Sequence, residues 1–582
     1  MRGIISCLIA VSLFACNPAW AAAGEDDGNE RSNEKGSPAA EKKPSETAKS
    51  GTPAAPNPAI ESELKQLRQL VQEQAERLHG LQQRLADVEG AVAAGKSAST
   101  DGASSAISAV QPAKPAESAA SSAPPAVRQM NDGDQGKKAS PLYFEIGKAK
   151  FTPGGFVDFT SVTRSTNLGS GIATSFGSIP YSNTPQGRLS EFHFSAQYSR
   201  LSLKVDAPVT DSTSLTGYVE TDFLGYQPAN AYVTANSNSL RMRVFWAQIK
   251  HGKWDVLGGQ EWSLLTPNRV GLSPLTSDLF YTLAEDPNFQ VGLTWARQAQ
   301  FRVTYHPAQK WAVGVSLENP QQFAPASVVF PSTTYLAQFD NGSSATNAPS
   351  ATTNTSVPNL QPDVIVKTSY DTQFGQHPFH IEVAGLLRRF RVLNTLAAPS
   401  HTDTVIGGGG SINLNFQLVK SLTVVANSFY SDGGGRYIFG LGPDAIVKPD
   451  GNVSAVHSGS GIAGLEWQAT PRYMLYSYYG GAYFARNYGF LPNAGSSCAG
   501  VAGFSCVGFG FPGSANSSNR AVQEGTFGVI PTLWSNPSYG KLQVITQYSY
   551  LVRSPWSTLT TPPTPKNAHL SMVYAGLRYI LP

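Results

Sequence analysis

The residues best suited to chemistry in this chain are charged side chains that alternate with apolar ones in its C-terminal three quarters. The clearest case is residues 199–207, where Arg200 and Lys204 alternate with Leu201 and Leu203. Because successive side chains of a strand point to opposite faces, this spacing places the charges on one face of an extended segment. Such a segment suits a sheet with one apolar face and one face toward water.

Opposed charges recur in neighbouring segments with the same pattern. Residues 215–223 form the next candidate strand and place Glu220 and Asp222 on its polar face. If these strands close around a narrow water-filled lumen, its low-dielectric walls strengthen the field of any unpaired charge. The residues that we predict to line this lumen are Arg200, Lys204, Glu220, Asp222, Arg241, Arg243 and Arg388.

The candidate strand from Leu240 to Lys250 does not alternate consistently. Arg241 and Arg243 fall on one parity, whereas Gln248 and Lys250 fall on the other. A β-bulge within the strand, or a misplaced boundary, would explain the conflict.

Two further sets of charges bear on a constriction. Arg388, Arg389 and Arg391 form a basic run, and strand alternation cannot put both Arg388 and Arg389 in the lumen. One of them is then expected at a rim, at a subunit contact or facing lipopolysaccharide. Residues 266–288, between Trp262 and a strand expected near Phe289, are the predicted folded-in loop, with charged residues Arg269, Asp278, Glu285 and Asp286.

Groups arranged for catalysis are not found in the sequence. The histidines are scattered, and His377 and His380 have no acidic or thiol partner at metal-ligand spacing. There is no Gly-x-Ser-x-Gly elbow with a credible histidine, and Gly407–Gly410 begins a strand instead of preceding a helix. We therefore predict no enzyme activity, no cofactor and no metal.

The last strand indicates where these segments belong. Val573, Ala575, Leu577 and Tyr579 fall on one face at period two, and the glycine–aromatic spacing after Gly576 is typical of the closing strand of an outer-membrane barrel. No segment offers about 18 consecutive apolar residues, so a membrane-spanning helix is not expected. A membrane protein without such a helix must be a closed barrel, because lipid cannot satisfy free backbone groups.

The start of the chain reads as an export signal. Arg2 precedes an apolar run from residue 4 to residue 15, and small residues then allow cleavage after Ala21 or Ala23. Leu13-Phe14-Ala15-Cys16 is a competing lipoprotein cleavage box, which leaves lipidation of Cys16 open. Near the other end, Cys498 and Cys506 lie in one Gly-rich stretch of an exported chain and are predicted to form a disulfide, with two free thiols as the alternative.

The 582 residues divide into five parts. The predicted fold is an all-β transmembrane β-barrel of about 16 antiparallel strands, with 18 as the alternative, preceded by an α-helical coiled coil. Only 14% of residues are charged and the net charge is +3, a slight lean toward anions. The parts are a signal peptide (1–23), a disordered segment (24–56), a periplasmic coiled coil (57–95), a disordered linker (96–140) and an outer-membrane barrel (141–582), whose long loops are expected at 322–360, 434–458 and 487–522.

A heptad repeat predicts the coiled coil. Asn57 and Pro58 are suited to start a helix. Apolar residues then recur at intervals of four and three, and only Gln74 interrupts them. Five heptads favour an oligomer over the alternative, a lone amphipathic helix. The seam residues are Ile60, Leu64, Leu67, Val71, Gln74, Leu78, Leu81, Leu85, Val88 and Val92.

Several short motifs resemble those of DcaP-like trimeric outer-membrane porins. They are Ser199-Arg200-Leu201, Arg241-Met242-Arg243, Gly258-Gly259-Gln260-Glu261-Trp262-Ser263 and the segment from Gln547 to Arg553. Phosphate-selective porins share some of this pattern. The resemblance covers most of residues 57–582 and implies a homotrimer of 16-stranded barrels, a three-helix periplasmic coiled coil and passive uptake of small, often anionic solutes. The chain departs from the pattern by ending in Pro582, where an aromatic residue is usual.

The function predicted from these observations is a porin of the bacterial outer membrane with its N-terminal region in the periplasm. Its expected partners are two further copies of the chain, outer-membrane lipid and lipopolysaccharide, small solutes and, as an open alternative, the cell wall; no nucleic acid is expected. A structural barrel that tethers the outer membrane to the cell wall through its coiled coil is the alternative function. Barrel size favours the porin, because an anchor needs fewer strands.

Overall fold

The computed structural model describes residues 142–225, 238–274, 279–340, 357–558 and 565–582, together with Gln72. The predicted signal peptide, disordered segment, coiled coil and linker, residues 1–140, lie outside the described residues apart from Gln72. In the part of the chain that the structure describes, no helix is long and apolar enough to cross a membrane. The barrel is therefore described by itself.

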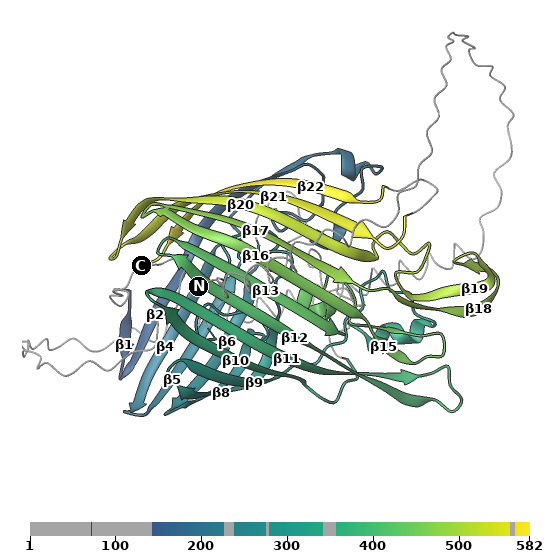
Figure 1. Ribbon diagram of the computed structural model, residues 1–582, viewed down its shortest axis with the longest axis horizontal. Helices are drawn as coiled ribbons and strands as arrows, with labels where there is room; N and C mark the ends of the chain where they lie inside the picture. The colour runs from purple at the N-terminus through teal and green to yellow at the C-terminus, as the bar shows by residue number, and fades with distance from the viewer. Residues whose placement is uncertain (1–71, 73–141, 226–237, 275–278, 341–356, 559–564) are drawn as a thin grey trace, which may run out of the picture. The chain divides into compact units, whose positions relative to one another are not determined.

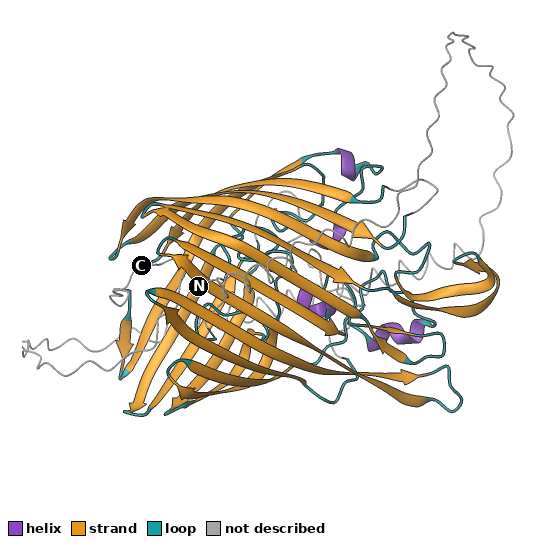
Figure 2. Cartoon of the chain, in the orientation of Figure 1, coloured by secondary structure: helices purple, strands orange, loops and turns teal. Residues whose placement is uncertain are grey.

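Antiparallel strands form one closed sheet, visible as the tilted ribbons of Figures 1 and 2. Each strand of the ring pairs with the next, and the last returns to the first, with Phe156 opposite Ile580 and Arg164 opposite Met572. The ring consists of β2 (Ala149–Arg164), β4 (Arg200–Thr210), β5 (Thr213–Asp222), β6 (Arg241–His251), β7 (Trp254–Trp262), β8 (Arg297–Ala308), β9 (Trp311–Glu318), β10 (Asp363–Phe374), β11 (His377–Asn394), β12 (His401–Val419), β13 (Leu422–Asp432), β16 (His457–Thr470), β17 (Tyr473–Phe484), β20 (Asn519–Asn536), β21 (Gly540–Pro555) and β22 (Ala568–Ile580).

Two short strands complete the sheet without adding to the ring. β1 (Phe144–Ile146) pairs with the start of β2, on the same side of β2 as β22, which pairs with the rest of that strand. β3 (Glu191–Ser195) pairs with the end of β2, on the same side as β4, which pairs with its start. The 18 strands of the sheet therefore occupy 16 positions. This confirms the smaller of the two predicted strand numbers.

Alternation along the strands gives the barrel an apolar outside and a polar inside. On β4, Leu201 is 49% exposed on the outer face, whereas its neighbour Arg200 is 1% exposed on the inner face. Val573 and Leu577 of β22 are likewise exposed outward, and Arg578 is buried inward. An outer surface of this kind is stable only in an apolar solvent, which indicates that the strands span a lipid bilayer.

The two rims of the barrel differ. At one rim, turns of two or three residues join neighbouring strands, such as Gly252–Lys253 between β6 and β7. Aromatic pairs such as Trp254–Tyr305 and Trp311–Tyr370 lie beside these turns, as expected for an interfacial belt. The opposite rim carries the longer connections, which include η2 (Phe176–Ser178), η3 (Gln186–Arg188), η4 (Thr333–Gln338), η5 (Gly435–Ile438) and the β14–β15 pair (Ala445–Val447 and Val453–Ala455).

The sequence placed most strands correctly but misjudged several ends. Gly407–Gly410 lie within β12 and do not begin it, because pairing with β11 continues back to His401. The strand expected near Phe289 begins only at Arg297, since Phe289 belongs to a buried connection.

The predicted loop 487–522 contains a hairpin of β18 (Asn487–Cys498) and β19 (Val501–Phe509), and β20 begins within it at Asn519. The predicted disulfide between Cys498 and Cys506 is present and joins the two strands of this hairpin.

Candidate functional site: the constricted interior of the barrel

The connection between β7 and β8, residues 263–296, folds into the barrel and narrows it. Its described residues contact inward-facing side chains from strands around the ring, from β4 and β6 to β11, β16, β20 and β21. The predicted folded-in loop, residues 266–288, is confirmed for its described parts, 266–274 and 279–288; Asp278 lies outside them. We call residues 263–296 the constriction loop.

A cluster of charges holds one end of the constriction loop against β4, β5 and β6. Arg243 donates to Glu220 Oε1 at 2.7 Å, to Asp222 Oδ2 at 2.7 Å and to Asp286 Oδ1 of the loop at 2.9 Å. Arg241 donates to Asp222 Oδ2 at 2.6 Å and approaches Asp286 at 3.3 Å. The sequence predicted each of these residues from its own segment, and the structure joins them in one network.

A bulge in β6 brings both arginines into this network. The pairing of β5 with β6 shifts by one residue at Arg243: Glu220 lies opposite Val244, but Thr221 lies opposite Met242. Arg243 and Val244 are consecutive and both buried, so alternation restarts there and Gln248 also faces inward. The bulge that the sequence left as one of two explanations is confirmed.

Exposure within the network is uneven. The side chain of Arg241 is 30% exposed, whereas Asp222 and Asp286 are 1% and 4% exposed. Arg243 is fully buried. Water in the lumen therefore meets the guanidinium group of Arg241 more than the carboxylates that neutralise it.

The third basic residue of this wall, Arg200, also contacts the constriction loop. Its guanidinium group donates to the carbonyl oxygen of Pro287 and to Asn288 Oδ1, each at 3.2 Å, and lies 4.0 Å from Glu220. Arg200 thus joins β4 to the loop residues that follow Asp286.

The acids of the constriction loop differ in their electrostatic surroundings. Burial raises the pKa of Asp286, but the guanidinium groups of Arg243 and Arg241 outweigh it and hold the pKa of this carboxyl well below its usual range. Burial, with repulsion from Asp286, raises the pKa of Glu285 to about 8. Asp286 is therefore held in its ionised, paired form, whereas the surroundings of Glu285 favour its neutral form.

Across the lumen, the loop is held by a second set of polar contacts. The backbone N–H of Asn268 donates to Glu382 of β11, whose carboxylate also lies 2.9 Å from Lys367 Nζ of β10. Arg269 donates to Glu466 Oε2 of β16 at 3.0 Å. The side chain of Arg269 is again more exposed than its acid, at 17% against 6%.

The last part of the loop is anchored to β20 and β21. The backbone N–H of Val291 donates to Glu524 Oε2 at 3.0 Å, and Gln547 of β21 accepts from the N–H of Leu283 at 2.7 Å. Gly292 lies against the backbone of β16 at a φ of +100°, and a Cβ atom there would collide with the carbonyl oxygen of Gly461. Only glycine fits this conformation and this close approach.

The two remaining predicted lumen residues lie apart from this network. Arg388 of β11 is buried inside the barrel between Asp363, at 3.0 Å, and Asp444, at 2.9 Å, and joins β11 to the connection that follows β13. Lys204 faces inward and pairs with Asp206 at 2.9 Å, with a quarter of its side chain exposed. Arg389 faces outward, as alternation required if Arg388 faces inward.

Several functional contacts were missed in the sequence. Lys367, Glu382 and Glu466 fix the constriction loop, and Asp158 pairs with Arg578 at 2.7 Å across the closure of the barrel. Alternation is the signal that could have found these positions, since each neighbours outward-facing apolar residues. The sequence did not show which residues pair with them, because the partners lie far away along the chain.

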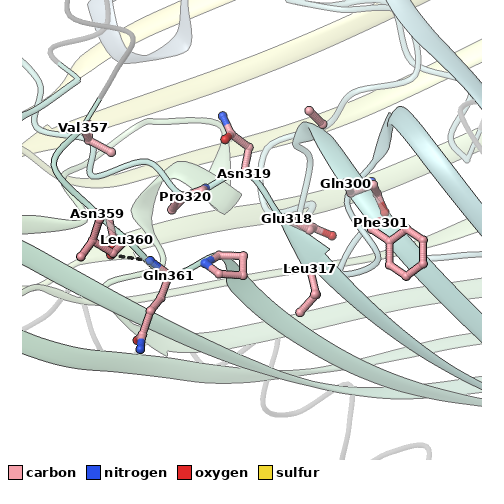
Figure 3. A pocket seen from close by; sticks show the side chains of 12 residues that line it. Gln300, Phe301, Leu317, Glu318, Asn319, Pro320, Val357, Asn359, Leu360 and Gln361 are labelled. Atoms are coloured by element: carbon pink, nitrogen blue, oxygen red, sulfur yellow. Dashed lines mark hydrogen bonds between the residues drawn. The ribbon is translucent and has the colours of Figure 1, made fainter.

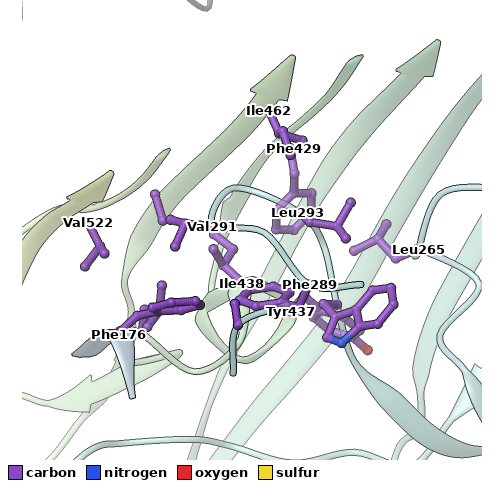
Figure 4. Packing of buried hydrophobic residues seen from close by; sticks show 14 of the residues in the cluster. Phe176, Leu265, Phe289, Val291, Leu293, Phe429, Tyr437, Ile438, Ile462 and Val522 are labelled. Carbon is purple, nitrogen blue, oxygen red and sulfur yellow. The ribbon is translucent and has the colours of Figure 1, made fainter. Parts of the chain in front are cut away.

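Apolar side chains also fill part of the interior (Figure 4). Phe289, Val291 and Leu293 of the constriction loop pack with Tyr437 and Ile438 of η5. Phe176 of η2 joins them, together with inner-face residues Phe429, Ile462 and Val522. We call this set the inner apolar cluster. A barrel of this size encloses water where it is not filled, so the cluster limits any passage to the remaining cross-section.

Several solved structures are similar to this chain, although no protein-family profile and no curated protein matches it. The outer-membrane channel DcaP of Acinetobacter baumannii has 16% identity and a TM-score of 0.49, over 75% of this chain and 99% of that chain. An anion-selective porin from Comamonas acidovorans has 9% identity and a TM-score of 0.40, over 74% and 100%. OmpF of Salmonella typhi has 9% identity and a TM-score of 0.39, over 76% and 100%.

The class of the protein is defined by its own strand pairing and surface. It is a closed, 16-stranded, membrane-spanning β-barrel with a charged interior that an inserted loop constricts. Within the described residues, no cluster of three or more His, Cys, Asp or Glu side chains could hold a metal ion.

Proposed function

We propose that this protein is a bacterial outer-membrane porin through which small hydrophilic solutes, anionic ones preferentially, diffuse down their gradients. The observation that carries this proposal is the constriction itself, a loop held across a charged lumen by contacts to strands on all sides. Passive passage requires no catalytic group, only a wet path and a charged wall that selects among solutes.

The anion preference rests on which charges water can reach. Arg241 and Arg269 are each several times more exposed than the carboxylates that pair with them. The accessible field at the constriction is therefore positive, although formal charges nearly balance there. In a low-dielectric channel such a field attracts anions and repels cations.

The assembly that we propose is a homotrimer, with the predicted coiled coil of residues 57–95 on the periplasmic side. Short turns at one rim and long connections at the other follow the usual division into a periplasmic and an extracellular rim. The heptad seam supports a bundle, and the opposite-signed pairs Glu63–Arg68 and Arg84–Glu89, which flank the seam in the sequence, favour a parallel one.

A second candidate function is a structural anchor, and the inner apolar cluster favours it. Because this cluster occupies part of the lumen, a barrel that passes no solute could still hold the coiled coil at the membrane. The outer membrane would then be linked to the cell wall through residues 57–95.

One experiment separates the two candidates. The purified full-length protein is placed in a planar bilayer, and single-channel current is recorded under a salt gradient. A porin gives stepwise openings in groups of three with an anion-favouring reversal potential, and Arg241→Gln should move that potential toward cation preference. A Lys310→Gln variant on the short-turn rim serves as the control.

Two results would count against the porin. A correctly folded barrel without conductance would transfer the assignment to the anchor. An unchanged reversal potential in the Arg241→Gln variant would remove Arg241 from the selective part of the path.

A further inference from the structure

On the outer surface of the barrel, a groove lies where the long-connection ends of β8, β9 and β10 meet. Its volume is about 570 Å³. Phe301 of β8 and Leu317 of β9 form one side, and Leu360, on the segment that enters β10, lies on the other (Figure 3). Pro362 also lines the groove. Leu360 is 82% exposed, and Phe301 and Leu317 also face outward. The groove therefore presents these apolar side chains together with polar ones, among them Gln300, Asn359 and Gln361.

Two arginines stand beside this groove on the outer face of β11. Alternation puts Arg389 and Arg391 on the same outward face as Leu387, which is exposed to lipid. Arg389 donates to Gln361 Oε1 at 3.3 Å and to Thr404 Oγ1 at 3.4 Å, and both acceptors are neutral. Among the described residues, neither arginine forms an ion pair. This sets them apart from Arg243 and Arg388, which face inward and are neutralised by carboxylates.

The groove and the arginines are joined into one surface. Gln361 lines the groove and accepts from Arg389, and the amide of Asn359 donates to the carbonyl oxygen of Arg389. Gln322 fixes the backbone of Arg391 from the inner side, accepting from its N–H at 3.0 Å and donating to its carbonyl oxygen at 2.8 Å. The guanidinium group of Arg389 is thus tied to the groove through Gln361, and Arg391 follows on the same outward face of β11 with its backbone fixed by Gln322.

The depth of this surface in the membrane follows from strand geometry. Phe379 belongs to an aromatic cluster beside the short turn of β11, and Arg389 lies ten residues further along the strand. A rise of about 3.4 Å per residue on a strand tilted by about 40° places Arg389 roughly 26 Å above that cluster. The apolar band of such barrels is about 25 Å tall, so Arg389 and Arg391 reach the headgroup level of the far leaflet.

We propose that this surface binds the lipid A part of lipopolysaccharide, with a phosphate group on Arg389 and Arg391 and an acyl chain in the groove. Arginine is suited to bidentate contact with phosphate. On the membrane side of Arg389, Phe301 and Leu317 lie at the level of Leu387 across the strand pairs, and their exposed apolar side chains suit a hydrocarbon chain. Lipopolysaccharide is the phosphorylated glycolipid of the outer leaflet. The assignment of that leaflet to this rim rests on the proposed function, because the long connections are taken as extracellular.

The test uses the full-length protein in detergent and native mass spectrometry with diphosphoryl lipid A as the probe. Wild-type protein should retain one lipid A per barrel. The double variant Arg389→Gln/Arg391→Gln should retain at least about tenfold less, because two charge-assisted phosphate contacts are lost. The variant Lys310→Gln/Arg472→Gln removes two positive charges at the opposite rim and should bind as the wild type does.

Two further arms identify the bound group. Leu360→Glu places a negative charge in the groove without touching either arginine and should also lower lipid A binding. Monophosphoryl lipid A should bind more weakly than the diphosphoryl form, and millimolar inorganic phosphate should not compete. Heat-modifiable gel migration of each variant establishes that the barrel is folded.

The proposal is overturned if the double variant retains lipid A as well as the wild type does. It is also overturned if inorganic phosphate displaces the lipid, because the arginines would then form a free-anion site, or if a cysteine at position 360 crosslinks two copies, because a second chain would then occupy the groove. Conductance measured on the same preparations keeps this result distinct from the porin assignment, since lipid A can bind a barrel that passes no current.

Discussion

At the scale of single residues, charge pairing divides the arginines of this barrel into two kinds. Arg243 is fully buried and contacts three carboxylates, so its charge holds the constriction loop to β5 and β6. Arg241 contacts two of the same carboxylates but stays partly exposed, so its charge can also be reached from the lumen. Two arginines with one residue between them therefore have different tasks.

This difference predicts that Arg243 matters more for stability than Arg241. Replacing Arg243 with methionine removes the fully buried cation that three carboxylates share and leaves Arg241 and Arg200 near them, and breaking a buried ion pair typically costs about 3–5 kcal/mol. We expect Arg243→Met to lower the thermal midpoint of the barrel clearly, measured by heat-modifiable gel migration. Arg241→Gln, the matched control on the same strand, should lower it much less; equal midpoints would show that Arg243 does not secure the loop.

Sequence alternation identified Arg200, Glu220, Asp222 and Arg388 as inward-facing, and the structure places all four on the inner face. It could not state their exposure, because burial inside the barrel depends on the constriction loop and not on the strands themselves. The same limit applies to Lys367 and Glu382, whose contacts with Asn268 join segments about 100 residues apart.

At the scale of elements, the constriction loop is the decisive feature. It enters the lumen because its charged residues find opposite charges on several strands and its apolar residues join the inner apolar cluster. Its close approach to β16 depends on Gly292, which no other residue could replace without displacing the backbone.

We therefore predict that Gly292→Ala pushes the loop away from β16 and changes single-channel conductance. Gly271→Ala is the matched control, because Gly271 also has a positive φ but no atom lies near the added methyl group. That control incurs only local backbone strain of roughly 1–2 kcal/mol. If the two variants conduct alike, the contact between the loop and β16 does not set the width of the path.

The elements also show where periodicity failed as a guide. Residues 289–295 alternate apolar residues with polar residues or glycine and were expected to start a strand, but they are buried inside the barrel as an irregular segment. Gln290 and Thr294 are buried as fully as Phe289, so a period of two does not by itself distinguish a strand from a segment packed in an interior. The hairpin β18–β19 was missed for the opposite reason, since its Gly-rich and Ser-rich sequence lacks alternation.

At the scale of the whole molecule, closure depends on the contact between the first and last strands of the ring. Asp158 of β2 and Arg578 of β22 lie opposite each other, are both fully buried and are joined at 2.7 Å. The guanidinium group of Arg578 also lies 4.1 Å from the centre of the Phe156 ring. A charged pair thus joins segments more than 400 residues apart at the point where the sheet closes.

Breaking this pair should destabilise the closed barrel. Asp158→Asn leaves a buried guanidinium without its counter-ion, and we expect a loss of about 3–5 kcal/mol, seen as a lower thermal midpoint. Lys204→Gln, which breaks the partly exposed pair with Asp206, should cost only about 0–1 kcal/mol. A midpoint in Asp158→Asn no lower than in Lys204→Gln would mean that backbone pairing alone closes the ring.

The sequence by itself determined the barrel and the inward or outward direction of most strand residues, and it favoured the pairing of Cys498 with Cys506 that the structure shows. These properties are local: a period of two assigns each side chain to a face, and the apolar length of a segment decides whether it can cross a membrane. The tertiary structure decided which inward charges are neutralised, where the loop crosses the lumen and that Arg389 stands beside a groove. Those properties depend on contacts between distant strands, and closure of the sheet brings such strands together in ways that local spacing does not encode.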